Sequence, residues 1–247
     1  MIDIVILSVI QGICEWFPIS SSGHLYIFHR LLGVKPDISL DIFLHSSALC
    51  AIFIFFRKEI LKIIKVFFTF DTKNENFKTI LYIISATFIT GIIGFFLKDY
   101  EGTLENKNLV SAGFLITSIF LFLSKKEGKN KIDFKTSLII GLSQGLALLP
   151  GISRSGATIS TAKILGVNDK DSFDFSFLLA IPAIIGAIII KFEQIKNINS
   201  DYIITGFLIS FFVSIITLYF LKKIFLRRRF QYFCIYTFLV FLFSLFI

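Results

Sequence analysis

The chain has 247 residues, of which 55% are hydrophobic and 17% charged, and its formal net charge is +8. With a mean hydropathy of +0.81, this composition excludes an ordinary soluble protein and predicts one all-α integral membrane domain over residues 1–247. Lys and Arg concentrate in a few connectors, which fits the positive-inside rule and argues against a nucleic-acid partner. The three cysteines are odd in number and lie in apolar surroundings, so they predict no disulfide framework.

The first stretch, residues 1–29, is apolar but is interrupted by the motif QGICEWFPISSSGH at 11–24. Pro18 and the Ser/Gly cluster after it break a helix. Two short helices joined at residues 18–23 are therefore predicted, entering and leaving the membrane on the same side as a re-entrant hairpin. Non-helical backbone at that depth requires a cover of protein or water.

The rest of the chain alternates between apolar segments and charged connectors. Residues 57–66 carry lysines at i, i+4 and i+7 with apolar residues between them, which is typical of an interfacial helix. Residues 136–166 are apolar but broken at 150–156, which predicts a second hairpin. Six segments are predicted to span the membrane: residues 38–56, 79–97, 109–124, 172–190, 202–221 and 230–247.

The basic residues of the connectors predict the orientation. Connectors 57–78, 125–135 and 222–229 carry six, five and five Lys or Arg, whereas 98–108 and 191–201 carry two each. Placing the first three inside puts both termini outside. The first hairpin then enters from the outer face and the second from the inner face.

A shift of 133 residues brings QGLALLPGISRSGA (144–157) onto the first motif without a gap, and places Arg154 on Ser21. The same shift brings 38–56 onto 171–189. We therefore predict two inverted-topology repeats, about residues 1–125 and 134–247, each a re-entrant helical hairpin plus three transmembrane helices. Polar, broken segments in corresponding halves indicate a site near the bilayer midplane. The identical pairs of the two motifs are Gln11 and Gln144, Gly12 and Gly145, Ile19 and Ile152, Ser20 and Ser153, Ser22 and Ser155, and Gly23 and Gly156.

Glu15 and Arg154 are the charged residues of these two motifs. A charge at bilayer depth costs roughly 2.5–3.5 kcal/mol, so it usually marks a pathway or a site. The alternative for Glu15 is a neutral or hydrated carboxyl near the interface. The guanidinium of Arg154 matches phosphate oxygens bidentately, and this role is compatible with neutralising Glu15.

The SSSG and SRSG turns supply hydroxyls and backbone N–H groups beside helix starts, which favour anions. Serine is also common in membrane helices as an inter-helix hydrogen-bonding residue. From these two turns we predict that the substrate phosphate is bound by Ser20, Ser22, Gly23, Ser153, Ser155 and Thr158.

His24 closes the first turn, and together with Glu15, Ser21 and Arg154 it completes a set for attack on a phosphoryl centre. Ser21 or an activated water would be the nucleophile, and Glu15 or His24 would handle the proton. A divalent ion could bridge Glu15 to a diphosphate. Apolar walls around such a site imply a substrate with a lipid tail. The two other histidines, His29 and His45, are interpreted as structural.

The QxxxE element at 11–15, its FPISSSGH continuation and PGISRSGAT at 150–158 resemble the undecaprenyl-diphosphate phosphatases of the bacitracin-resistance family. The resemblance covers essentially the whole chain. It implies a multi-pass enzyme of the bacterial inner (cytoplasmic) membrane, a phosphoric anhydride hydrolase that removes the terminal phosphate of undecaprenyl diphosphate and recycles the carrier lipid for peptidoglycan synthesis. It also implies a site facing the periplasmic side and dependence on a divalent cation, Mg or Ca.

Matched residue by residue, the family's catalytic positions fall on Glu15, Ser21, His24 and Arg154. Gln11 stands where the family's pattern also admits Glu, so this chain lacks a second carboxylate there, which weakens schemes with two acidic metal ligands. The nucleophile stays open between Ser21 and His24, with Ser21 favoured. Positions that line the family's phosphate site fall on Gln11, Ser20, Ser153, Ser155 and Thr158.

The main alternative function is a polyprenyl-phosphate transporter or flippase, because inverted repeats with broken helices are transporter architecture. A purely structural membrane subunit is a second alternative, but it leaves the two polar hairpins unexplained. The sequence leaves open the polyprenyl chain length, the number of metal ions and whether the protein is a homodimer.

Overall fold

The computed structural model describes residues 2–35, 38–100, 106–125, 128–190 and 200–247. Parts of several predicted connectors, at 36–37, 101–105, 126–127 and 191–199, lie outside the described residues. Within the described ranges the regular secondary structure is helical, apart from one isolated bridge between Asn130 and Val167. In chain order the helices are α1 (Ile2–Cys14), α2 (Ser21–Leu32), α3 (Ile38–Phe55), α4 (Arg57–Thr69), α5 (Glu75–Leu97), η1 (Lys98–Tyr100), α7 (Lys107–Leu123), α8 (Phe134–Leu146), α9 (Arg154–Ile164), α10 (Asp169–Ile190), α12 (Ser200–Leu226), η2 (Phe230–Tyr232) and α13 (Phe233–Ser244).

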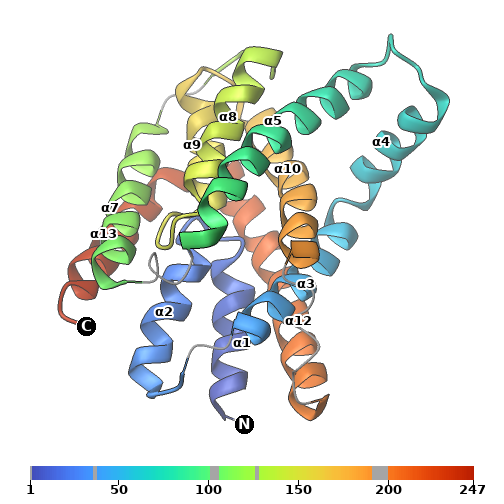
Figure 1. Ribbon diagram of the computed structural model, residues 1–247. Helices are drawn as coiled ribbons and strands as arrows, with labels where there is room; N and C mark the ends of the chain where they lie inside the picture. Colours follow the sequence, from blue (N-terminus) through green and yellow to red (C-terminus); the bar gives the residue numbers. More distant parts are fainter. Residues whose placement is uncertain (1, 36–37, 101–105, 126–127, 191–199) are drawn as a thin grey trace.

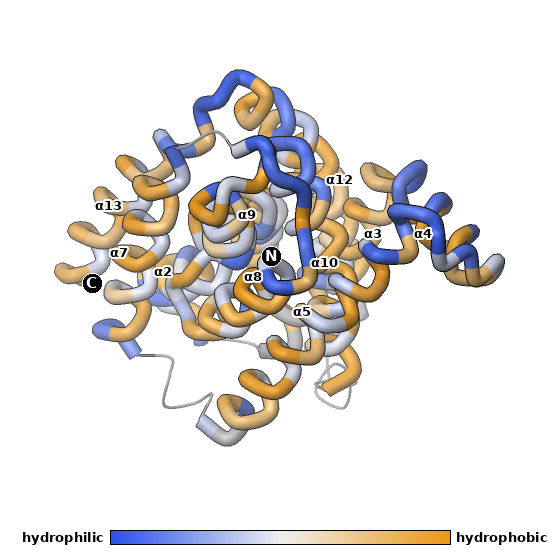
Figure 2. The backbone as a smooth tube through the Cα atoms, turned by 90° about the horizontal axis from the view of Figure 1, so that it is seen from above, coloured by the Kyte–Doolittle hydropathy of each residue, from blue (hydrophilic) through white to orange (hydrophobic). Residues whose placement is uncertain are grey.

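The helices have the apolar character of a membrane protein. In the described part of the chain, three are long and apolar enough to cross a membrane: Glu75–Leu97, Asp169–Ile190 and Ile204–Leu226. Figure 2 shows hydrophobic residues along most helices and hydrophilic ones gathered in the connecting segments. The predicted class, an all-helical membrane protein, is confirmed. Shorter apolar helices are Ile2–Cys14, Phe43–Phe55, Lys107–Leu123 and Phe230–Ser244.

Both predicted helix breaks are present, and each ends in the same type of cap. The Ser20 hydroxyl accepts a hydrogen bond from the backbone N–H of Gly23 at 3.2 Å, which starts α2. The Ser153 hydroxyl accepts one from Gly156 at 3.1 Å, which starts α9. A serine at this position satisfies an otherwise unpaired N–H group, so the serines of both motifs fix where the second helix of each hairpin begins.

The two hairpins meet in the middle of the molecule. In Figure 1, α1 and α2 lie below the level at which the turns meet, and α8 and α9 lie above it. α1 packs against α12, α8 against α5, and α7 against α13. The α1–α12 contact is close because Gly12 has no side chain: a Cβ there would lie 2.8 Å from the Ser210 carbonyl oxygen. Small residues allow this kind of approach between membrane helices.

The buried core surrounds the two turns. Trp16, which is 0% exposed, packs against Phe177 with 5.6 Å between ring centroids. Phe114 of α7 is also fully buried. Large apolar side chains such as Phe88 and Phe96 are exposed on the outside of α5, as expected of a surface that faces lipid.

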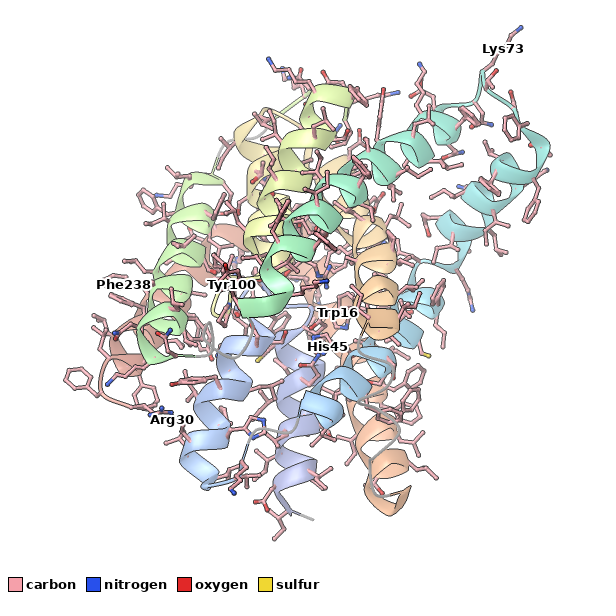
Figure 3. The ribbon with its side chains drawn as sticks, in the orientation of Figure 1. Trp16, Arg30, His45, Lys73, Tyr100 and Phe238 are labelled. Atoms are coloured by element: carbon pink, nitrogen blue, oxygen red, sulfur yellow. The ribbon has the colours of Figure 1, made fainter. Side chains whose placement is uncertain are left out.

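The predicted helix with the spaced lysines is observed as α4, Arg57–Thr69. α4 and the first part of α5 project from the rest of the molecule, with Lys73 at the tip of this arm (Figures 1 and 3). Its predicted place at the membrane interface stays a prediction.

Candidate active site

Glu15 lies at the centre of a set of hydrogen-bond donors where the two turns meet. It is 7% exposed. The Gln11 amide donates to its Oε2 at 3.1 Å, and the Ser21 hydroxyl donates to the same oxygen at 2.8 Å. Arg154 Nη2 donates to Oε1 at 2.9 Å. The predicted carboxylate, hydroxyl and guanidinium are therefore in direct contact, although Arg154 follows Glu15 by 139 positions.

The guanidinium of Arg154 has one half of its fork free. Nη2 binds Glu15, whereas Nη1 is buried without a hydrogen-bond partner among the described residues. The guanidinium carbon lies over the Trp16 ring, 5.6 Å from its centroid, in a cation–π contact. A buried donor without a partner is costly. Because it belongs to a charged fork, an anion is the ligand that would satisfy it.

Two helix N-termini point into this region. Ser21 is the first residue of α2, and Arg154 is the first residue of α9. A helix N-terminus carries unpaired N–H groups and a partial positive charge, so it favours an anion. The site therefore combines two helix starts with one guanidinium.

Three of the predicted phosphate-binding hydroxyls form hydrogen bonds within the protein. The Ser153 hydroxyl caps α9. The Ser155 hydroxyl donates to the Trp16 carbonyl oxygen at 3.1 Å, which ties the second turn to the first. The Thr158 hydroxyl donates to the Arg154 carbonyl oxygen at 2.8 Å. These hydrogen bonds fix the backbone around Arg154 and tie it to the first turn. Direct contact of the three hydroxyls with a phosphate stays a prediction.

The remaining predicted residues lie at the first turn. Gly23 allows α7 and the second turn to approach, because a Cβ there would lie 2.6 Å from the Phe114 ring and 3.0 Å from the Cα of Gly151. Ser22 is exposed, and its hydroxyl lies 3.4 Å from that of Ser20. Gln11 is fully buried, and its Oε1 has no hydrogen-bond partner in the described part of the chain. Ser22 thus lies at the exposed edge of the site, and Gln11 lies at its buried end.

His24 lies in the same turn, but its ring faces away from Glu15. Its Nδ1 lies 2.8 Å from the Ser20 carbonyl oxygen, and its Nε2 lies 2.8 Å from the Tyr236 hydroxyl. The sequence predicted His24 as a partner of Glu15 and Ser21. The structure instead pairs it with a residue of α13 that no motif contains.

His45 corrects the sequence-based interpretation, which took it as structural. Its Nε2 lies 3.2 Å from Glu15 Oε2, so the site includes a residue of α3. Figure 3 shows His45 near the centre of the molecule. The signal that could have found it is a histidine within a predicted membrane span, where an ionisable residue marks a site by default.

Thr117 of α7 is a second residue that the sequence did not indicate. It is 0% exposed, and its hydroxyl donates to the Gly151 carbonyl oxygen at 3.1 Å. The same hydroxyl accepts the backbone N–H of Ser153 at 2.9 Å. It therefore fixes the backbone of the α8–α9 turn directly before Arg154.

A cavity of about 450 Å³ lies elsewhere, between α4, α5, α10 and the segment at 131–132. None of the predicted site residues lines it. Its walls carry lysines and carboxylates that pair with each other, such as Lys131 with Glu75 at 3.0 Å. Charges that neutralise each other do not define a ligand, so geometry and charge place the candidate site at the meeting of the two turns.

Fold and site together define a class: a helical membrane protein in which two broken hairpins bring a carboxylate and a guanidinium together inside the bundle. A family model described as "Bacitracin resistance protein BacA" matches residues 4–243. The chain therefore belongs to the BacA family.

Curated relatives cover nearly the whole chain. A protein of Thermosipho africanus named undecaprenyl-diphosphatase is 40% identical, over 94% of this chain and 95% of its own length. Proteins with the same name from Borreliella burgdorferi and Methanococcus vannielii are 38% and 35% identical. These alignments cover 96% and 98% of this chain, and 94% and 98% of the relatives.

Proposed function

We propose that this protein hydrolyses undecaprenyl diphosphate to undecaprenyl phosphate and inorganic phosphate. The family and the names of the relatives support this activity. The structural observation that carries it is the contact of Glu15 with both Ser21 and Arg154, with half of the Arg154 fork free. A carboxylate, a hydroxyl and a free anion-binding donor are what phosphoryl transfer requires.

In the proposed mechanism, Arg154 Nη1 and the N-termini of α2 and α9 bind the terminal phosphate. Ser21 Oγ attacks its phosphorus while Glu15 accepts the hydroxyl proton, and the bond to the lipid-phosphate oxygen breaks, so that undecaprenyl phosphate leaves. The oxygen of a water then attacks the phosphorus, the bond to Ser21 Oγ breaks, and the proton held by Glu15 returns to Ser21. The protons of the water leave with the inorganic phosphate. The hydrogen bond of 2.8 Å between Ser21 and Glu15 supports this assignment of nucleophile and base.

A divalent cation, Mg or Ca, is part of the proposal. The described residues contain no group of three His, Cys, Asp or Glu that could hold a metal by themselves. The unpartnered Gln11 Oε1 beside the Glu15 carboxylate nevertheless fits a cation that is completed by diphosphate oxygens, as Mg²⁺ commonly is. Gln11 and Glu15 would hold the ion, which would neutralise charge on the phosphate oxygens.

The finer architecture is also proposed: two inverted repeats, about residues 1–125 and 134–247, in one membrane domain. Support comes from Ser111 and Ser244, which are 133 positions apart and whose hydroxyls lie 2.7 Å from each other. Positions related by the repeat shift are expected to meet on the pseudo-two-fold axis. A position in the inner membrane of a bacterium, with the site open to the periplasmic side, and a homodimer belong to the same set of proposals.

Phosphate release by purified protein in detergent tests the function. We expect the wild type to release phosphate from undecaprenyl and farnesyl diphosphate, and to lose this activity with a chelator and regain it with Mg²⁺. Arg154→Ala should lower kcat/KM by about 10³-fold or more. Arg30→Ala, which removes an exposed guanidinium of α2, is the control and should leave kcat/KM unchanged.

Binding of the lipid without phosphate release, with or without divalent ions, would contradict the proposal and favour the transporter.

A further inference from the structure

Tyr236 of α13 holds His24 in a fixed orientation. Its hydroxyl lies 2.8 Å from His24 Nε2. The two rings are stacked, with 5.8 Å between centroids and 4° between planes. Phe114 contacts the imidazole edge-on at 5.3 Å. His24 is 5% exposed, so few other groups can reach its ring.

The hydrogen bonds of His24 define its tautomer. Nδ1 faces the Ser20 carbonyl oxygen at 2.8 Å. A carbonyl oxygen only accepts, so the proton of the neutral ring is on Nδ1. Nε2 then has a lone pair, and the Tyr236 hydroxyl is the donor that fits it. A hydroxyl that donates to Nε2 favours the tautomer that can bind Ser20.

Ser20 connects His24 to the site, because it binds the His24 ring and directly precedes Ser21. Its φ is +69°, in the left-handed region that a residue with a Cβ seldom adopts. The next residue, Ser21, donates to Glu15 at 2.8 Å. The strained backbone of Ser20 thus sets the direction of Ser21, and His24 stabilises that backbone by binding its carbonyl oxygen.

We propose that Tyr236 and His24 are positioning residues for Ser21. Tyr236 selects the Nδ1–H tautomer of His24, His24 holds the Ser20 carbonyl, and the Ser21 hydroxyl stays directed at Glu15. This inference rests on the proposed function, in which Ser21 is the nucleophile, and it gives His24 no part in proton transfer.

Asn and Gln at position 24 test the role of His24, because the Asn amide N–H replaces Nδ1–H and the Gln amide replaces Nε2. In the phosphate-release assay, His24→Asn should keep kcat within about tenfold of the wild type, because it retains the bond to Ser20. His24→Gln and His24→Ala should lose more. An equal loss in all three variants would overturn the proposal, since a general base acting through Nε2 needs the imidazole itself.

Tyr236→Phe removes only the hydroxyl. It should lower kcat about tenfold and leave KM within about twofold, because ground-state binding of the lipid does not use it. Tyr232→Phe, which removes an exposed hydroxyl of η2, is the matched control and should match the wild type. Unchanged kcat in Tyr236→Phe would overturn the proposal.

¹⁵N NMR of histidine-labelled protein reads the tautomer directly. The chain has three histidines, so the signals of His24 are assigned by their loss in His24→Asn. The wild type should show the Nδ1–H form, and Tyr236→Phe should show a mixture. An Nε2–H form in the wild type would contradict the inference. A wild type that releases no phosphate would refute the proposed function instead, and the NMR result would stand separately.

Discussion

Glu15 is compatible with its apolar surroundings because side chains from several helices form hydrogen bonds and ion pairs with its carboxylate. Four side chains contact its two oxygens, each from a different helix: Gln11 of α1, Ser21 of α2, His45 of α3 and Arg154 of α9. Burying a charge is tolerated where hydrogen bonds and an opposite charge compensate the lost water. The same donors orient the carboxylate, so a group that stabilises the fold also prepares the chemistry.

Adjacent serines give a matched test of the nucleophile. Ser21→Ala should lower kcat by about 10³-fold or more, because it removes the attacking oxygen. Ser22→Ala removes the next hydroxyl, which is exposed at the edge of the site and lies 3.4 Å from that of Ser20; losing this one predicted phosphate contact should lower kcat by no more than about tenfold. Phosphate release at saturating farnesyl diphosphate measures both. Comparable activity of Ser21→Ala and Ser22→Ala would favour an activated water as nucleophile.

At the level of single residues, the sequence predicted those members of the site that lie in its two motifs. Glu15, Ser21 and Arg154 were predicted together, and they are in contact. His45 and Tyr236 were missed, because they reach the site from helices that carry no motif. Closeness in sequence placed His24 with Glu15, whereas the direction of its side chain on α2 pairs it with α13.

At the level of helices, glycines set how closely the elements approach. A Cβ on Gly113 of α7 would lie 2.3 Å from the Pro150 carbonyl oxygen, which is backbone and cannot move aside. A Cβ on Gly91 of α5 would meet no atom within 4 Å. The first glycine therefore lets α7 press against the α8–α9 turn, while the second has no such function.

These two glycines provide a test of the helix packing. Gly113→Ala should destabilise the protein by about 1–3 kcal/mol, as overpacking does, and should displace the turn that presents Arg154. Gly91→Ala should leave stability unchanged or raise it by up to about 1 kcal/mol, because Ala is the better helix former. Thermal unfolding in detergent checks both variants. Equal melting temperatures would contradict the described packing of α7 on the turn.

The helix breaks were predictable because Pro, Gly and Ser interrupt an apolar pattern, and both observed breaks overlap the predicted ones but begin a few residues earlier. The second break is displaced: it was predicted at 150–156, whereas α8 ends at Leu146 and α9 begins at Arg154. The reason is a series of turns that starts before the proline, in which the N–H of Ala147 bonds to Ser143 and that of Leu148 to Gly145. Apolar residues carry these turns, so composition did not reveal them.

At the level of the whole molecule, the loop charges and the repeat lead to the same proposed arrangement. Single cysteines in a background without Cys14, Cys50 and Cys234 test it in intact cells. A cysteine at Lys73 or Lys135 should react only after the membrane is permeabilised, and one at Lys35 should react with an impermeant reagent from outside. All three positions are exposed. The reverse labelling pattern would contradict the proposed orientation, although it would leave the contact between the turns intact.

The central claim is that Glu15 and Arg154, one from each hairpin, act on the same phosphoryl group. A double-mutant cycle on kcat/KM with Glu15→Gln and Arg154→Gln tests it most directly, in the phosphate-release assay with farnesyl diphosphate. Each single variant should lose about 10³-fold or more, and the double variant should lose no more than about tenfold beyond the worse single variant, because the two residues act as a unit. Losses that multiply in the double variant would show that the two residues act independently, which would contradict this account.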